Sequence, residues 1–249
     1  GRETIKSNHI TLLAMNKKGY SNLSKLTTKA HLEGFYRNPR INLSWLAEKN
    51  EGIIVLSGCI QGILSRAIID GNLTHAENRI DWFKDVFGDR FFLEVMNHGI
   101  EEEALIAKQL IEYGKKKKIK VVATNDVHFL KKGDHVVQDL LLAIRSNQLI
   151  DDPTRFRAKW SNLHLSTESE MLKLFKGNEE CVGNTNLVSD MIDDFSDIFS
   201  NAKPIFPVVQ VPQAYKSSND YLRHLAEEGL KKRYQDNIEE AKLRLEKEM

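Results

Sequence analysis

The stretch Lys120-Val121-Val122-Ala123-Thr124-Asn125-Asp126-Val127-His128-Phe129 decides how the fold is interpreted. It opens with an apolar, β-branched run that is typical of a buried strand. It ends in polar residues, where a strand of an α/β fold delivers side chains to a site. Because side chains alternate along a strand, we expect Asp126 and His128 to point to the same side. A carboxylate beside an imidazole suits a divalent metal or proton transfer, and a hydrogen-bonded pair at a loop entrance is the alternative.

Strand and helix patterns alternate through the part of the chain that leads to this stretch. Short apolar runs predict strands near residues 9–15, 53–58, 90–96 and 119–125. Amphipathic patterns predict helices at about 20–34, 63–69, 72–87 and 101–113, with a short helix after Asn42. Such alternation is typical of parallel βαβ units, whose sites lie at the carboxyl ends of the strands, and the series can close into a barrel. We therefore predict an α/β fold with four parallel strands.

The pattern changes after His128. Helices are predicted over 134–146, over about 179–192, and up to Phe175 from a capping box that begins at Thr167. Residues 193–219 are irregular and are predicted to be a linker. Residues 220–249 are highly charged, and their irregularly spaced leucines predict a solvated helical segment. The expected organisation is therefore a domain over 1–192, a linker over 193–219 and a helical segment over 220–249.

Composition limits the function classes only in part. The chain has 249 residues, of which 41% are hydrophobic, so a substantial core can form. The net charge of +1 argues neither for nor against a nucleic-acid partner. Two distant cysteines form no disulfide framework, which fits a reducing cytoplasm. No stretch has the length of a membrane span, and no signal peptide is evident. Because the chain begins at Gly1 without an initiator Met, we expect a fragment of a longer protein.

Cys59 closes its predicted strand as Asp126 and His128 close theirs. In a parallel arrangement these strand ends share one rim, where a thiolate, an imidazole and a carboxylate would suit Zn²⁺ or a similar ion. The alternative for Cys59 is a small buried apolar residue. Glu94 and His98 lie at a third strand end, where the position of His98 before Gly99 favours a turn residue.

Four strings of sequence resemble one family. They are His9-Ile10-Thr11-Leu12-Leu13-Ala14, Glu33-Gly34-Phe35-Tyr36-Arg37-Asn38-Pro39-Arg40-Ile41, Leu56-Ser57-Gly58-Cys59 and Val122-Ala123-Thr124-Asn125-Asp126-Val127-His128. Their order and spacing are similar to the polymerase and histidinol phosphatase (PHP) domain of the bacterial replicative DNA polymerase III α subunit. The similarity runs from His9 to about Phe175. Tyr221 to Met249 also resembles the charged stretch that leads into the palm domain of that enzyme.

The resemblance implies a distorted, TIM-like (β/α)7 barrel, here partial and followed by a helical region. It implies up to three divalent ions, Zn²⁺ or Mn²⁺, and places the later ligands of the family on His9, Cys59, Asp126 and His128. The early ligands of the family would lie upstream of Gly1. The polymerase aspartates, which use Mg²⁺, would lie downstream of Met249, so no catalytic residue is expected within this chain.

The resemblance also implies a function. The chain would be part of a DNA-directed DNA polymerase, a nucleotidyltransferase, and its PHP region a structural brace and partner-binding module. Its metal site could support a 3′–5′ exonuclease. The implied partners are DNA and, through the intact subunit, a proofreading subunit, the sliding clamp and the clamp loader, with no membrane. The alternatives are a stand-alone PHP phosphoesterase for a small phosphate ester and a metal-free interaction module.

Two basic, aromatic loops are the candidate DNA contacts. Arg37 and Arg40 flank Pro39 in the first loop, and the second loop contains Arg155, Arg157, Lys159 and Trp160. Such side chains offer phosphate contacts and a stacking surface. The alternative is a pair of ordinary solvated loops.

Overall fold

The computed structural model describes residues 7–157, 162–196, 206–234 and 236–249. The chain divides into two compact units, residues 1–196 and residues 197–249. None of the described helices is long and apolar enough to cross a membrane.

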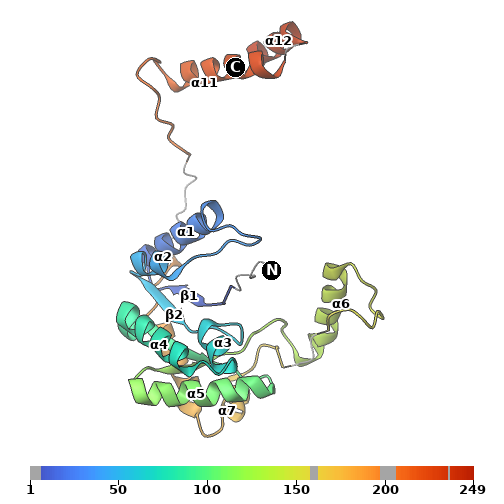
Figure 1. Cartoon of the computed structure of the whole chain (residues 1–249). Coiled ribbons are helices and arrows are strands. Elements are labelled where there is room, and N and C mark those ends of the chain that lie inside the picture. The colour runs from blue at the N-terminus through green and yellow to red at the C-terminus, as the bar shows by residue number, and fades with distance from the viewer. Residues whose placement is uncertain (1–6, 158–161, 197–205, 235) are drawn as a thin grey trace. The chain divides into compact units, whose positions relative to one another are not determined.

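All four predicted strands are present in the first unit (Figure 1). They are β1 (Thr11–Ala14), β2 (Ile53–Leu56), β3 (Phe91–Val95) and β4 (Val121–Ala123), in the spatial order β1-β2-β3-β4. The pairs β2-β3 and β3-β4 are parallel, as predicted. The described strands form one four-stranded sheet, so the closed barrel stays a prediction.

The prediction of a parallel β1 is wrong. β1 pairs antiparallel with β2, with Thr11 opposite Leu56 and Ala14 opposite Ile53. The intervening chain forms α1 (Lys17–Leu32) and α2 (Leu43–Glu48) and returns to the end of β1 from which it left. There the Met15 amide donates to the Gly52 carbonyl at 2.8 Å, so β2 begins where β1 ends. A parallel strand would need a connection that crosses the length of the sheet.

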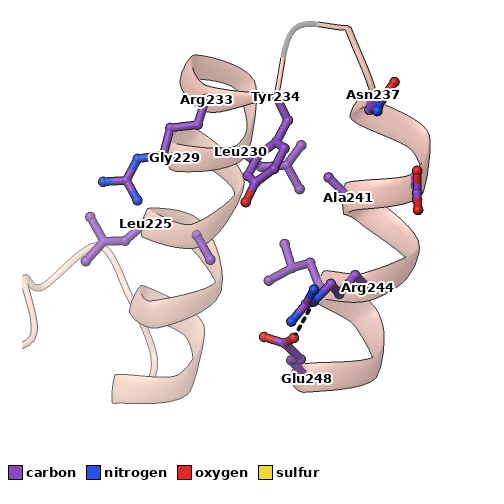
Figure 2. A pocket seen from close by; sticks show the side chains of 12 residues that line it. Leu225, Gly229, Leu230, Arg233, Tyr234, Asn237, Ala241, Arg244 and Glu248 are labelled. Carbon is purple, nitrogen blue, oxygen red and sulfur yellow. Dashed lines mark hydrogen bonds and ion pairs between the residues drawn. The ribbon is translucent and has the colours of Figure 1, made fainter.

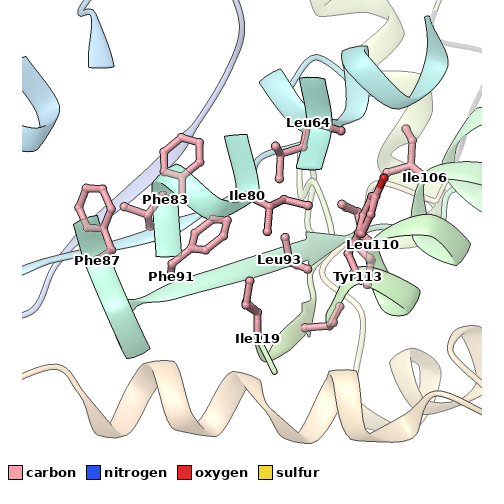
Figure 3. Close-up of a cluster of buried hydrophobic side chains, with 14 of the residues drawn as sticks. Leu64, Ile80, Phe83, Phe87, Phe91, Leu93, Ile106, Leu110, Tyr113 and Ile119 are labelled. Carbon is pink, nitrogen blue, oxygen red and sulfur yellow. The ribbon is translucent and has the colours of Figure 1, made fainter. Parts of the chain in front are cut away.

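Strands β2, β3 and β4 are buried on both faces, and the core is larger on one of them. Alternate residues such as Phe91 and Leu93 pack against α3 (Ile63–Ile69), α4 (Leu73–Phe87) and α5 (Glu101–Lys117) (Figure 3). Their neighbours Ile54, Leu56, Phe92 and Val122 form a smaller cluster on the other face with Val188 of α9 (Thr185–Asp190). This burial of both faces explains why the strands are continuous apolar runs rather than alternating ones.

Asparagine side chains begin three of these helices. Asn16, Asn42 and Asn72 accept hydrogen bonds from the amides three residues later, which satisfies donors that have no partner within the helix. Gly88 ends α4 with a φ of 55°, a conformation that favours glycine. The predicted helix starts at Asn42 and Asn72 are thus confirmed.

The chain after β4 is mostly helical. A short 3₁₀ turn (Lys132–Asp134) leads into α6 (His135–Ser146), and α7 (Glu168–Leu174) begins at the predicted Thr167 capping box. α6 leaves Val136, Val137, Leu140, Leu141 and Ile144 exposed. The single helix predicted over 179–192 is wrong, because α8 (Glu179–Gly183) and α9 are separated at Asn184. The Asn184 side chain is buried and donates to the Val121 carbonyl at 2.8 Å, which fixes the junction against β4.

The second unit contains a helical pair, α11 (Ser218–Arg233) and α12 (Ile238–Glu248). A groove of about 500 Å³ lies between these helices and is lined by Leu225, Leu230, Tyr234 and Leu245 (Figure 2). Arg223 pairs with Glu246 across the two helices, and Arg244 pairs with Glu248 within α12. Exposed ion pairs of this kind contribute little to stability, and of the named groove residues only Leu230 is buried.

We expect Phe83→Ala to lower the free energy of unfolding by about 3–5 kcal/mol. The Phe83 ring is fully buried and lies 5.0 Å from the Trp82 ring and 5.1 Å from the Phe91 ring, so its loss leaves a cavity. Phe35→Ala is the matched control because the Phe35 side chain is exposed, and it should change stability by no more than about 0.5 kcal/mol. Urea unfolding measures both variants, and equal losses would contradict the core as described.

Candidate metal centre

The antiparallel course of β1 brings His9 to the edge of the sheet where β2 ends. The Cys59 sulfur lies 3.6 Å from His9 Nδ1, and the His9 amide donates to the Gln61 carbonyl at 2.9 Å. Gly58 permits this approach, since its φ is +88° and a Cβ there would lie 3.1 Å from the His9 carbonyl oxygen. Two of the four predicted ligands are therefore in contact, although 50 residues separate them.

Asp126 and His128 lie beside each other in the loop that follows β4. Strand β4 ends at Ala123, so strand alternation does not orient these side chains as the sequence suggested. His128 Nδ1 lies 2.7 Å from the Asp126 carbonyl oxygen and 3.8 Å from the Asp126 carboxylate. The His128 amide donates to the Leu163 carbonyl at 2.8 Å, which holds the loop. Both side chains remain largely exposed, so a metal ion could reach them.

The Glu94 carboxylate joins the strand ends behind these residues. It accepts hydrogen bonds from the Thr124 hydroxyl at 2.7 Å, the Gly58 amide at 2.9 Å and the Thr11 hydroxyl at 3.3 Å. Glu94 is only 4% exposed. Burial raises the pKa of Glu94 above its ordinary value, although these three hydrogen bonds oppose the shift. The carboxylate therefore connects β1, the end of β2 and the end of β4.

A second buried network reaches the Asp126 loop from β3. His98 Nδ1 lies 2.8 Å from a Glu103 carboxylate oxygen, and His98 Nε2 lies 2.8 Å from Asn125 Oδ1. The Asn125 amide nitrogen donates to the His164 carbonyl at 2.7 Å, which fixes its oxygen toward His98. Each ring nitrogen thus faces a side-chain oxygen that can accept a hydrogen bond, and the Asp126 amide also donates toward Nε2 at 3.4 Å. Burial lowers the pKa of His98, but Glu103 and Asn125 outweigh that effect and the pKa is raised.

The environment of Cys59 favours the protonated thiol, chiefly because the side chain is partly buried. Burial raises the pKa of Cys59, and the negative charges of Asp126 and Glu94 raise it further. Sulfur, imidazole nitrogen and carboxylate oxygen suit Zn²⁺, and a cation would favour the thiolate. Among the described residues, however, no group of three or more His, Cys, Asp and Glu lies close enough to hold an ion. The structure forms two pairs of ligands, and the shared site stays a prediction.

Comparison with known proteins gives the same family as the sequence strings. Residues 2–98 match the model of the PHP domain. The chain is therefore similar to PHP domains over residues 2–98. It is 36% identical to the DNA polymerase III subunit alpha of Borreliella burgdorferi over 92% of its length, and 37% identical to that of Thermus aquaticus over 94%. The subunit of Treponema pallidum is 36% identical over 97% of the chain. The chain spans about one fifth of the length of these relatives.

One predicted DNA contact is corrected by the structure. The Arg155 side chain is fully buried and forms two hydrogen bonds with the Asp139 carboxylate of α6. It also donates to the Ile150 carbonyl at 2.8 Å. A guanidinium that lies inside the protein and binds a carboxylate cannot contact a phosphate, so Arg155 holds the loop in place instead.

The other predicted DNA contacts have different environments. Arg37 is exposed, with a φ of 64°, and its guanidinium lies 5.8 Å from the Tyr36 ring. The Arg40 guanidinium lies 5.1 Å from the same ring and donates to the Tyr36 carbonyl. Arg157 is exposed and donates to the Ile150 carbonyl. Lys159 and Trp160 lie outside the described residues.

Sequence reasoning missed several residues that shape this edge of the sheet. Thr11, Thr124 and Asn125 were parts of quoted strings, but their bonds to Glu94 and His98 join strands that are distant in the sequence. Glu103 had a local signal, since an acidic residue in the first turn of a helix five positions after a histidine can reach back to it. His98 does lie in a turn, as predicted, but it is buried.

We expect Glu94→Gln to change the pH dependence of stability. A carboxyl with a raised folded-state pKa contributes stability below its unfolded pKa of about 4.3, and this contribution is lost as pH rises through the folded pKa. The glutamine side chain of the variant does not titrate, so its contribution to stability does not fall as pH rises. The variant should therefore gain stability relative to the unaltered chain as pH rises from 4 through the raised pKa, with a slope of at most about 1.4 kcal/mol per pH unit.

Glu77→Gln is the control of opposite sign. Hydrogen bonds from Lys116 and then Lys117 lower the pKa of Glu77, so its contribution is present above its unfolded pKa. That variant should lose stability relative to the unaltered chain as pH rises. Urea unfolding over a pH series measures both differences, and the same sign for the two variants would contradict the assignment for Glu94.

Proposed function

We propose that this chain is a region of a replicative DNA polymerase α subunit, and that its PHP domain holds a divalent-metal site for phosphodiester hydrolysis in the 3′–5′ direction. The observation that carries the proposal is the contact of His9 with Cys59 at the sheet edge that also bears Asp126 and His128. The similarity to DNA polymerase III α subunits supports the polymerase assignment.

The residues present suit such a site in their chemistry. Two imidazoles, a thiol and a carboxylate offer the nitrogen, sulfur and oxygen donors that Zn²⁺ binds, and imidazole with carboxylate suits Mn²⁺. A divalent ion at such a site supplies an activated water and charge stabilisation for hydrolysis of a phosphodiester. His128 Nε2 is the ring nitrogen that would bind the ion, because Nδ1 lies against the Asp126 carbonyl.

A structural brace is the second candidate role, and a separate observation favours it. The Glu94 carboxylate accepts hydrogen bonds from groups at three strand ends, so protein groups contribute directly to holding this edge of the sheet together. A domain of this kind could position neighbouring parts of a polymerase whether or not metal is bound. The two roles differ in what His128 does, because His128 contributes nothing to the Glu94 network.

Polymerisation itself is assigned to parts of the subunit outside this chain. The adjacent pairs Asp151-Asp152 and Asp193-Asp194 are the carboxylates that could suggest a polymerase site. Asp152 accepts hydrogen bonds from the amide and hydroxyl of Thr154, and Asp194 accepts them from those of Ser196. Both carboxylates therefore stabilise local turns, and neighbouring side chains of an extended chain diverge, which makes them poor joint ligands.

The test of the metal site is His128→Ala in the full-length polymerase that contains this chain. The variant should lose bound Zn²⁺ or Mn²⁺ and any metal-dependent 3′–5′ nuclease activity, while polymerisation stays largely intact. Elemental analysis and degradation of end-labelled single-stranded DNA measure these effects. The chain alone should bind metal weakly, because no three of the described His, Cys, Asp and Glu side chains lie close enough together to hold an ion.

His31→Ala is the matched control, since His31 Nδ1 also lies near a backbone carbonyl, that of Thr27, but on the exposed face of α1. It should change neither metal content nor nuclease activity. Loss of polymerisation along with the nuclease in His128→Ala would contradict a brace that depends on the Glu94 network alone, because His128 is not part of that network. Unchanged metal content and nuclease activity would exclude His128 as a ligand.

For DNA contact, we expect Arg37→Ala in the same polymerase to reduce the slope of log K against log salt by about 0.9, the value for one lost phosphate contact. Arg37 suits this role because it is exposed beside an aromatic ring. Lys108→Ala removes an exposed charge on α5, away from the loop, and should leave the slope unchanged. Fluorescence anisotropy with a primer–template over a salt series measures both. An unaltered slope in Arg37→Ala would assign the loop to folding or to a protein partner.

A further inference from the structure

The loop that carries Asp126 and His128 is held on its C-terminal side by backbone hydrogen bonds of Phe129 with Leu163 and Leu165. Strand β4 ends at Ala123, and Asp126, Val127 and His128 are exposed. Within the loop, the Val127 amide donates to the Asn125 carbonyl at 2.8 Å, and the His128 amide reaches the Leu163 carbonyl. The order of such an exposed segment depends on the side chains that it packs against and hydrogen-bonds with. The side chain beneath it is Asn125, which is half-buried.

Asn125 is held from two directions. Its amide nitrogen donates to the His164 carbonyl at 2.7 Å and to the Ser166 hydroxyl at 3.2 Å. Its oxygen faces His98 Nε2 at 2.8 Å. The Asp126 amide also approaches that ring nitrogen, at 3.4 Å, which is longer and weaker. His98 therefore contacts the loop at the residue directly before Asp126.

His98 is itself fixed by α5. One Glu103 carboxylate oxygen binds the His98 ring at Nδ1, and the other accepts the His98 backbone amide at 2.6 Å. His98 and Glu103 are both buried, with 6% exposed. Gly99, with a φ of +81°, lets the chain turn between β3 and α5 so that Glu103 can reach back. The carboxylate thus sets both the position and the rotation of the ring.

We infer that Glu103, His98 and Asn125 form a relay that positions the Asp126–His128 loop for metal binding. His98 acts through Asn125 and is a positioning residue. The inference rests on the proposed metal site for its purpose, but the ordering of the loop is a property of the metal-free chain. Hydrogen-bonded groups behind metal ligands set the orientation of those ligands in other proteins, and their loss costs 10–100-fold in affinity.

The test is amide hydrogen exchange of the metal-free chain, read at Val127 and His128, whose amides are both hydrogen-bonded. His98→Gln cannot bind Glu103 and Asn125 together, so exchange at these two amides should accelerate by at least about tenfold. Glu103→Gln keeps the shape but weakens the hold on the ring, and it should accelerate the same amides to a smaller extent. In the double variant, the acceleration of exchange should be smaller than the product of the two single accelerations, since both changes break the same relay.

Asn22→Ala is the matched control for a lost buried hydrogen bond. Asn22 is 3% exposed and donates to the Glu51 carbonyl at 2.9 Å, at the opposite end of the sheet where β2 begins. It should lower global stability without a selective effect on Val127 and His128. The relay is overturned if His98→Gln accelerates these amides no more than Asn22→Ala does.

Addition of Zn²⁺ to the same samples tests the proposed metal binding separately from the ordering of the loop by the relay. In the unaltered chain, Zn²⁺ should slow exchange at His128, and His98→Gln should need about 10–100-fold more Zn²⁺ for the same effect. Equal Zn²⁺ requirements in the two chains would overturn the positioning role. Absence of any Zn²⁺ effect in the unaltered chain would count against metal binding, while the metal-free comparison would still decide whether the relay orders the loop.

Discussion

The buried carboxylate of Glu94 is the interaction on which this edge of the molecule depends. An ionisable group in an apolar interior is costly unless its hydrogen bonds are satisfied. Glu94 meets this requirement with donors that come from β1, from the end of β2 and from the end of β4. The need to satisfy one carboxylate therefore determines how closely the strand ends approach, and the predicted ligands are placed as a consequence.

The direction of β1 is the second constraint. If β1 ran parallel to its neighbours, His9 at its start would lie at the far end of the sheet from Cys59. Because β1 is antiparallel, the start of β1 and the end of β2 meet, and the two side chains are in contact. The feature that the sequence predicted wrongly is thus the one that makes His9 suitable as a partner of Cys59.

The buried ion pair of Arg155 and Asp139 is a further case in which contacts between distant elements decide the environment of a residue. From its neighbours in the sequence, Arg155 belongs to a basic surface, and the sequence alone could not separate it from Arg157. In the structure the two differ completely, because Asp139 of α6 lies within reach of Arg155 and the whole guanidinium is buried. Composition describes a segment, but burial is decided residue by residue through contacts with distant elements.

The sequence by itself determined the local structure and the resemblance to the PHP domain. Continuous apolar runs specified four strands, Asn42 specified a helix cap, and the quoted strings indicated the PHP domain that residues 2–98 match, because these signals depend only on neighbouring residues. Only the tertiary structure decided the direction of β1, the interruption at Asn184, the burial of Arg155 and the bonds of Glu94 and His98. Each of these depends on hydrogen bonds between elements distant in the chain, and no local pattern encodes which donor meets which acceptor.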